Sequence, residues 1–121
     1  MKKRILVVDD DEMVLTALGE LLKPEGYEVQ LVSSGSEAML RLDEDGYDLL
    51  LLDIIMPLMD GFELCRKVRD KERYRETPIV FLTAKSREED KISGLAAGAN
   101  LFLSKPISPK KLLDIVSRTI G

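Results

Sequence analysis

The segment Leu49-Leu50-Leu51-Leu52-Asp53 places an aspartate directly after four consecutive leucines. A short, uninterrupted apolar run indicates a strand that is buried on both faces, which is typical of a parallel sheet. Gln30 interrupts one similar run, so we expect that strand at a more exposed edge and the other four to be buried. The runs that predict strands are Ile5–Val8, Val29–Val32, Leu49–Leu52, Ile79–Leu82 and Leu101–Leu103.

Helical patterns separate these five runs. An apolar stripe from Met13 to Leu22 predicts a first helix, and another helix is expected after Gly61. Basic residues dominate the stretch 66–76, which we interpret as a solvated helix end and loop rather than a binding patch. Strand followed by helix, five times over, predicts an α/β fold with a doubly wound parallel sheet. The serines expected to cap helices are Ser34, Ser86 (with Glu89 completing a capping box) and Ser108.

Length and composition restrict the class of protein. The chain has 121 residues, so we expect a single domain over residues 1–121. No apolar run is long enough to span a membrane, and the basic N-terminus lacks the apolar segment of a signal peptide. The single cysteine excludes an internal disulfide and favours a reducing, cytoplasmic location. The net charge of -4 disfavours a surface that binds nucleic acid directly.

The chain contains no histidine. This absence excludes a Ser-His-Asp triad, a histidine general acid and a histidine metal ligand. One cysteine is also too few for a zinc site built on thiolates. Any chemistry must therefore use carboxylates, hydroxyls, lysines or a hard metal ion.

Polar side chains follow four of the expected strands. The carboxyl ends of parallel strands meet at one edge of the sheet, where sites form in open α/β folds. Each of these residues alone has a structural explanation, such as capping a turn, but their joint placement favours a site. They are Asp9, Asp10, Asp53, Thr83 and Lys105. Asp11 directly precedes a helix, so we interpret it as a helix cap.

The expected carboxylate cluster has an electrostatic cost. Two carboxylates about 4 Å apart repel by roughly 1 to 4 kcal/mol, so a cation is expected among Asp9, Asp10 and Asp53. Oxygen ligands suit Mg²⁺ or a similar hard divalent ion. An ionised carboxylate is also a nucleophile that needs no general base, and its natural electrophile is a phosphoryl group. A lysine and a metal ion neutralise the charge that develops on the phosphoryl oxygens.

Through these motifs the chain closely resembles the receiver domain of two-component response regulators. The resemblance covers essentially the whole chain and rests on four motifs in order, each at the end of an expected strand. Any one motif is weak, but the set is specific. The motifs are Ile5–Asp10, Leu51–Gly61, Phe81–Ala84 and Leu103–Pro106. The resemblance implies a flavodoxin-like (βα)5 fold with strand order 2-1-3-4-5.

The resemblance also implies the chemistry of the site. Asp53 is the expected phosphoacceptor, and Thr83 and Lys105 are expected to contact its phosphoryl group. Mg²⁺ or Mn²⁺ is the expected ion. Its expected ligands are Asp9, Asp10, Asp53 and the backbone carbonyl of Ile55.

A second group of residues is implied to transmit the signal or to shape the site. Thr83 is expected to move toward the phosphoryl group, and Phe102 to change its rotamer with it. Phosphorylation would then shift an equilibrium between inactive and active surfaces. The responding face consists of the fourth helix, fifth strand and fifth helix, around Lys91, Ile92, Leu95, Phe102 and Lys111. The expected structural residues are Pro57, Gly61 and Pro106, the last with a cis bond to Lys105.

The resemblance implies partners as well. Because the chain has no histidine, the phosphoryl donor must be external: a sensor histidine kinase, a histidine phosphotransfer protein or a small phosphodonor. The downstream partner is an effector protein or an output domain, and a homodimer through the responding face is an open alternative. No turnover of an external substrate is expected, only phosphorylation and dephosphorylation of the chain itself. Because apolar Ile55 cannot orient an attacking water, we expect a long-lived phosphorylated form.

Three other classes of function are alternatives. A magnesium-dependent phosphatase with an aspartyl nucleophile needs a general acid two residues later, where Ile55 stands. A flavodoxin-like cofactor protein needs glycines or hydroxyls to hold a phosphate, and the acidic loop 9–11 lacks them. A degenerate receiver used only for binding is disfavoured, because every expected site residue is present.

Overall fold

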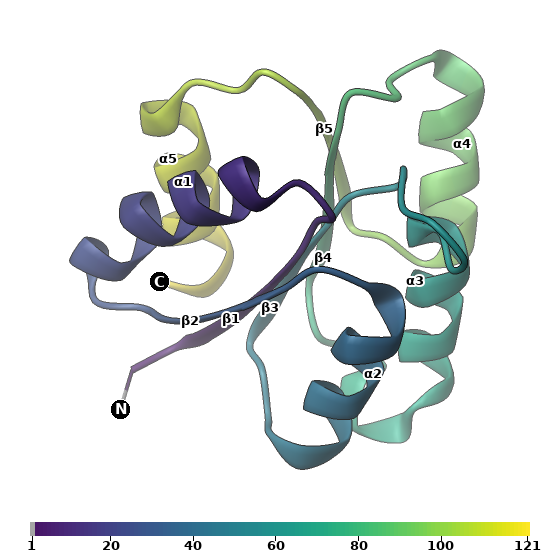
Figure 1. The fold of residues 1–121 in the computed structure, drawn as a ribbon, viewed down its shortest axis with the longest axis horizontal. Coiled ribbons are helices and arrows are strands. Elements are labelled where there is room, and N and C mark those ends of the chain that lie inside the picture. The colour runs from purple at the N-terminus through teal and green to yellow at the C-terminus, as the bar shows by residue number, and fades with distance from the viewer. Residues whose placement is uncertain (1) are drawn as a thin grey trace.

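The computed structural model describes residues 2–121, in which five parallel strands alternate with helices (Figure 1). The order across the sheet is β2-β1-β3-β4-β5, and each neighbouring pair is parallel. The predicted fold class and strand order are therefore confirmed. The strands are β1 (Arg4–Val8), β2 (Glu28–Val32), β3 (Leu49–Leu52), β4 (Ile79–Thr83) and β5 (Leu101–Ser104).

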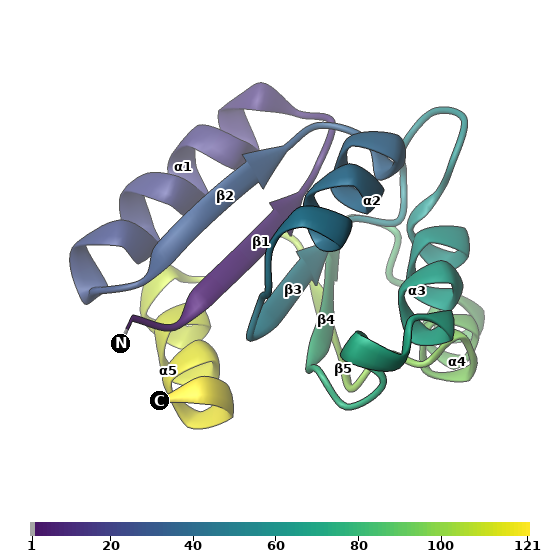
Figure 2. The same cartoon turned by 90° about the horizontal axis from the view of Figure 1, so that it is seen from below.

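Helices cover both faces of the sheet. Successive side chains of a strand point to opposite faces, so Ile5 and Val7 pack in one core and Leu6 and Val8 in the other. Figure 2 shows α1 and α5 on one side and α2, α3 and α4 on the other. None of the helices within residues 2–121 has the length and apolar character needed to span a membrane. The helices are α1 (Glu12–Leu22), α2 (Gly35–Glu44), α3 (Gly61–Asp70), α4 (Glu88–Ala97) and α5 (Pro109–Ile120), with 3-10 turns at Lys23–Glu25 and Glu72–Tyr74.

The two edge strands differ in how well their side-chain exposure was predicted. β2 lies at one edge and most of its residues are partly exposed, as Gln30 indicated. The prediction that the last run is buried on both faces is wrong, because β5 forms the other edge of the sheet. Leu101 in this strand keeps 38% of its surface exposed. An apolar run alone does not reveal that a strand has only one neighbour.

Serine caps were predicted correctly at two helices and wrongly at a third. The Ser34 hydroxyl accepts a hydrogen bond from the Glu37 amide, and the Ser108 hydroxyl accepts one from Lys111. Helix α4, however, begins one residue later than Ser86 would place it, with Arg87 as its N-cap. The Arg87 amide donates to the Asp90 carboxylate at 3.1 Å, so Asp90 takes the capping role assigned to Glu89.

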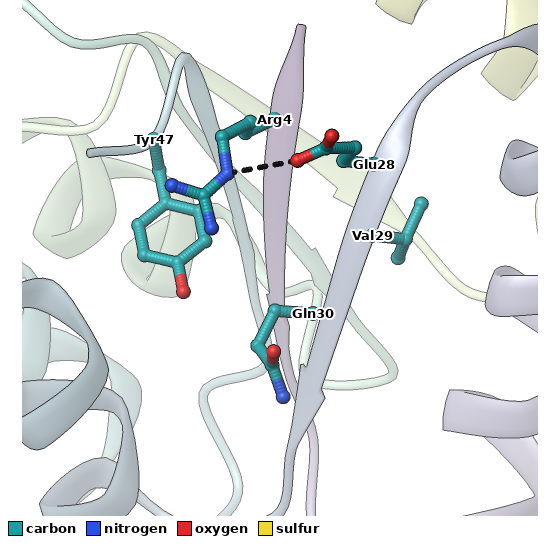
Figure 3. A pocket seen from close by; sticks show the side chains of 5 residues that line it. All are labelled: Arg4, Glu28, Val29, Gln30 and Tyr47. Atoms are coloured by element: carbon teal, nitrogen blue, oxygen red, sulfur yellow. Dashed lines mark ion pairs between the residues drawn. The ribbon is translucent and has the colours of Figure 1, made fainter. Parts of the chain in front are cut away.

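Arg4 connects the amino ends of β1 and β2 with the loop before β3 (Figure 3). Its Nε lies 3.2 Å from a Glu28 carboxylate oxygen, and its guanidinium carbon lies 5.0 Å from the centre of the Tyr47 ring. The same guanidinium donates to the Gly46 carbonyl at 3.1 Å. These side chains, with Gln30, line a polar hollow of about 110 Å³. This hollow lies at the opposite end of β1 from Asp9.

Arg69 holds several loops together at the same end of the sheet. Its guanidinium donates to the carbonyls of Gly98, Tyr74 and Thr77 and to the Asn100 side chain, at 2.6 to 2.9 Å. The stretch 66–76 was predicted to be simply solvated. That holds for the exposed Arg66 but is wrong for Arg69.

We expect Arg69→Lys to lower the free energy of unfolding by about 2 kcal/mol, because a lysine cannot reproduce a planar fork of several charged hydrogen bonds. Urea unfolding measures this difference. The exposed Arg66→Lys is the matched control and should change stability by less than about 0.5 kcal/mol. Equal stability of the two variants would contradict the assigned role of Arg69.

Candidate functional site

The predicted site residues meet at the carboxyl ends of β1, β3, β4 and β5. The registers Val8↔Leu52 and Thr83↔Ser104 bring the ends of β1 and β3 level with each other, and likewise those of β4 and β5. Leu52 pairs with Phe81, so β4 extends two residues beyond β3. The Asp53 amide donates to the Val8 carbonyl at 3.0 Å, which extends the pairing of β1 and β3 beyond their last strand residues. We call the group Asp9, Asp10, Asp53 and Lys105 the acidic cup.

Asp53 is held firmly in the acidic cup. Its side chain is nearly buried, with 6% of the residue exposed. Its Oδ1 accepts hydrogen bonds from the Ile54 amide at 2.7 Å and the Ile55 amide at 3.3 Å. Its Oδ2 faces the Lys105 Nζ at 3.1 Å. One oxygen is thus fixed by the backbone and the other is paired with a cation.

Lys105 bridges the two buried carboxylates. Its Nζ lies 2.6 Å from Asp9 Oδ2 as well as 3.1 Å from Asp53 Oδ2. Burial lowers the pKa of the ammonium, but its hydrogen bonds to Asp9 and Asp53 outweigh this effect, so the pKa lies above its ordinary value. Lys105 is therefore a permanent positive charge at neutral pH.

The ionised form of Asp9 is destabilised in this position. Burial raises the pKa of its carboxyl, and the hydrogen bonds from Lys105 and from the Asp11 amide offset only part of this effect. The nearby Asp53 charge acts in the same direction as burial. Further positive charge in the acidic cup would stabilise the ionised form of Asp9.

The acidic cup fits a divalent cation. Carboxylate oxygens of Asp9, Asp10 and Asp53 lie within 4.8 Å of one another, and Asp10 is exposed to solvent. Three carboxylates and one ammonium leave a net charge of minus two, which one divalent ion balances. Hard cations of this kind take oxygen ligands and retain several waters. Ile55, the other predicted ligand residue, contacts Asp53 through its amide.

Thr83 lies next to the acidic cup. Within residues 2–121, its hydroxyl makes no hydrogen bond to the carboxylates of the cup. Its side chain is fully buried, and its hydroxyl oxygen accepts from the Lys85 amide at 3.2 Å. Its carbonyl accepts from the Lys105 amide at 2.9 Å. Thr83 is thus linked to the cup through the backbone of Lys105.

Phe102 is half-buried on β5. Its ring centre lies 6.0 Å from that of Phe81, a fully buried residue of β4. A Cβ added to Gly94 of α4 would come within 3.0 Å of the Phe102 ring, so this glycine leaves room for the aromatic side chain. The ring therefore connects β5 with α4.

The loop after Asp53 contains a strained turn that the sequence did not reveal. The Pro57 carbonyl accepts from the Met59 amide at 2.8 Å, a three-residue turn. Its central residue, Leu58, has a φ of 70° and a fully exposed side chain. A leucine has no local preference for this conformation, so no sequence signal marks the position.

Two further predictions about local structure, the Asp11 helix cap and the cis bond before Pro106, are confirmed. The Asp11 carboxylate accepts from the Met13 amide at 2.9 Å, as expected of a helix cap. The Lys105–Pro106 bond is cis. A Cβ at Gly61 would lie 2.2 Å from the Asp53 carbonyl oxygen, so only glycine fits where α3 begins. Asp90, a buried carboxylate near Thr83 in the chain, was not predicted to have a role.

Comparison with known proteins identifies the class. The sequence model of the family "Response regulator receiver domain" matches residues 5–117. The chain belongs to this family.

A curated relative supports the same conclusion. The chain is 41% identical over 112 residues to the alkaline phosphatase synthesis transcriptional regulatory protein PhoP of Bacillus subtilis, a match that covers 93% of this chain and 46% of PhoP. The chain thus spans about half the length of the curated relatives it matches.

Solved structures share the whole fold. Vibrio cholerae chemotaxis protein CheY4 is 34% identical with a TM-score of 0.94, over 98% of this chain and 99% of that one. The receiver domain of the Pseudomonas aeruginosa sensor histidine kinase PA1611 is 35% identical with a TM-score of 0.91, over 100% and 99%. That structure has a magnesium ion coordinated in its active-site cleft.

Membership of the family defines the class of function. Receiver domains are phosphorylation-activated signalling switches, and this chain is one. Domains of this family interact with histidine kinases and with downstream effectors. The acidic cup, together with the magnesium-bound relative, supports a divalent metal at the carboxyl ends of the strands.

We expect Gly61→Ala to lower the free energy of unfolding by about 3 kcal/mol, because the new methyl group would collide with backbone atoms that cannot move aside. Thermal or urea unfolding measures the effect. Gly46→Ala is the control: its Cβ would meet only the end of the exposed Arg73 side chain, so stability should change by less than about 0.5 kcal/mol. A Gly61→Ala protein as stable as this control would refute the close approach.

Proposed function

We propose that Asp53 is the phosphoacceptor of this receiver domain and takes its phosphoryl group from a histidine of a sensor kinase or a phosphotransfer protein. The observation that carries the proposal is the contact of the Lys105 ammonium with both Asp9 and Asp53 at the carboxyl ends of the strands. This arrangement combines a nucleophilic carboxylate with a fixed positive charge.

The transfer uses few protein groups. A carboxylate oxygen of Asp53 attacks the phosphorus of the donor, a new P–O bond forms and the P–N bond breaks. The donor nitrogen leaves with the electron pair of that bond and takes up a proton from solvent. A carboxylate nucleophile such as Asp53 needs no general base, because it has no proton to lose before it attacks. Lys105, held beside it, balances the charge of the phosphoryl oxygens.

We assign the metal site to Asp9, Asp10, Asp53 and the carbonyl of Ile55. Bound Mg²⁺ or Mn²⁺ would supply further positive charge to the phosphoryl group. The all-oxygen donor set and the net negative charge of the acidic cup support this assignment.

The proposed switch runs from Thr83 to Phe102. On phosphorylation, Thr83 turns its hydroxyl toward the phosphoryl group and Phe102 changes rotamer with it. This change of the Phe102 side chain alters the face formed by α4, β5 and α5. Exposed apolar residues on this face support its use as a partner surface. They are Ile92, Leu95 and Leu101. The partner is an effector protein or an output domain, and the same face could also form a homodimer.

The wider assignments are part of the same proposal. The receiver domain extends over residues 1–121 and does not itself bind nucleic acid. It acts in the cytoplasm, in keeping with its one buried, unpaired cysteine. It turns over no external substrate, but it promotes its own phosphorylation and dephosphorylation at Asp53. Pro57, Gly61 and Pro106 shape the loops around the acidic cup.

Incubation with Mg²⁺ and acetyl phosphate tests the acceptor. We expect the wild-type chain to gain one phosphoryl group in intact-mass spectrometry and Asp53→Asn to gain none, because an amide is not a nucleophile here. Asp60→Asn is the control, since it makes the same change at a helix cap that asparagine also satisfies. Phosphorylation of Asp53→Asn at the wild-type rate would contradict the proposal.

The lifetime of the phosphorylated form tests the role of Ile55, whose side chain is more than half exposed. We expect Ile55→Asn to shorten the lifetime several-fold, because an amide can orient a water that isoleucine cannot. Leu58→Asn makes the same chemical change further along the loop and should leave the lifetime as in the wild type. Loss of label after removal of the donor measures both. A wild-type lifetime no longer than that of Ile55→Asn would count against this role.

A further inference from the structure

Asp90 is a buried carboxylate that the proposed phosphoryl transfer does not use. Only 4% of the residue is exposed, although it lies in the first turn of α4. A buried charge is costly unless it is paired and hydrogen-bonded. The partners of the Asp90 carboxylate therefore show which segment of the chain it restrains.

All the polar partners of the Asp90 carboxylate in residues 2–121 come from the loop between β4 and α4. Its Oδ2 accepts from the Arg87 amide at 3.1 Å and lies 3.4 Å from Arg87 Nε. Its Oδ1 lies 3.9 Å from the Lys85 Nζ. Asp90 thus fixes both cationic residues of the loop against the start of α4.

The other end of the same loop is fixed by Thr83. The Lys85 amide donates to the Thr83 hydroxyl oxygen at 3.2 Å. Lys85 therefore makes two contacts: its amide donates to the Thr83 hydroxyl oxygen, and its ammonium forms an ion pair with Asp90 at 3.9 Å. If the Thr83 side chain rotates toward a phosphoryl group on Asp53, its hydroxyl oxygen moves away from the Lys85 amide. The loop would then rearrange to satisfy that amide, against the contacts with Asp90.

We propose that Asp90 is a positioning residue that restrains the loop 84–87 in the arrangement in which the Thr83 hydroxyl is bonded to Lys85, and so opposes the phosphorylated state. The proposal rests on the proposed function of Asp53 and Thr83. A restraint of this kind shifts the population of two states without touching the phosphoryl group. Weakening it lowers the cost of the phosphorylated arrangement.

Binding of beryllium fluoride, a phosphoryl analogue, measures this cost. Amide NMR spectra of the whole chain, titrated with beryllium fluoride in saturating Mg²⁺, give the apparent affinity. We expect Asp90→Asn to bind the analogue several-fold more tightly than the wild type, because the amide oxygen keeps the Arg87 cap while both ion pairs are lost. Affinity for Mg²⁺ alone should not change, since Asp90 is not part of the acidic cup.

The matched control is Glu88→Gln, which removes one negative charge from the same helical turn but has no ion pair with the loop among the described residues. It should bind the analogue as the wild type does. Lys85→Gln tests the restraint from the loop side and decides the question if Asp90→Asn does not fold: it should also bind more tightly.

Three results would overturn the proposal. Asp90→Asn could bind the analogue no more tightly than the wild type, Glu88→Gln could gain as much affinity as Asp90→Asn, or Mg²⁺ affinity could change in parallel. In each of these cases the wild type still binds the analogue, so the role of Asp53 stands. A wild type that fails to bind it refutes the proposed function and this inference together.

Discussion

The contact of one ammonium with two buried carboxylates is the interaction on which the site depends. Parallel pairing of β1 with β3 brings Asp9 and Asp53 together at the ends of two adjacent strands. Lys105, at the end of β5, compensates part of their repulsion. The compensation is incomplete, because burial still raises the pKa of Asp9. The acidic cup therefore keeps an excess of negative charge, and this excess favours the binding of a metal cation.

The two ends of the sheet have different physical roles. At the amino ends, Arg4 and Arg69 each satisfy several acceptors and join loops that are distant in sequence. At the carboxyl ends, like charges lie close together, Leu58 holds a strained turn and Thr83 shares its hydroxyl with a loop amide. Stabilising contacts at one end allow the other end to keep unfavourable ones, which a ligand or a phosphoryl group can relieve.

The sequence predicted what depends on the order of elements along the chain. Alternating strands and helices imply a parallel sheet, and a parallel sheet brings residues such as Asp53 and Lys105 to one edge. It did not predict features that depend on neighbours in space. The exposure of β5 follows from its position at the edge of the sheet. Arg69 owes its role to carbonyl acceptors up to 29 residues away in the chain. Asp90 is buried by the packing of its surroundings, which the sequence does not reveal. The φ of Leu58 goes against its local preference. The roles of individual site residues in phosphorylation stay predictions.

Calorimetric titration with Mg²⁺ in the absence of any phosphodonor tests the central claim most directly. The account predicts one bound ion per wild-type chain and an affinity that falls by about tenfold or more in Asp10→Asn. Asp11→Asn, which keeps the helix cap and removes the same charge one residue later, should bind as the wild type does. Equal binding by Asp10→Asn and the wild type, or no binding by the wild type, would contradict the account.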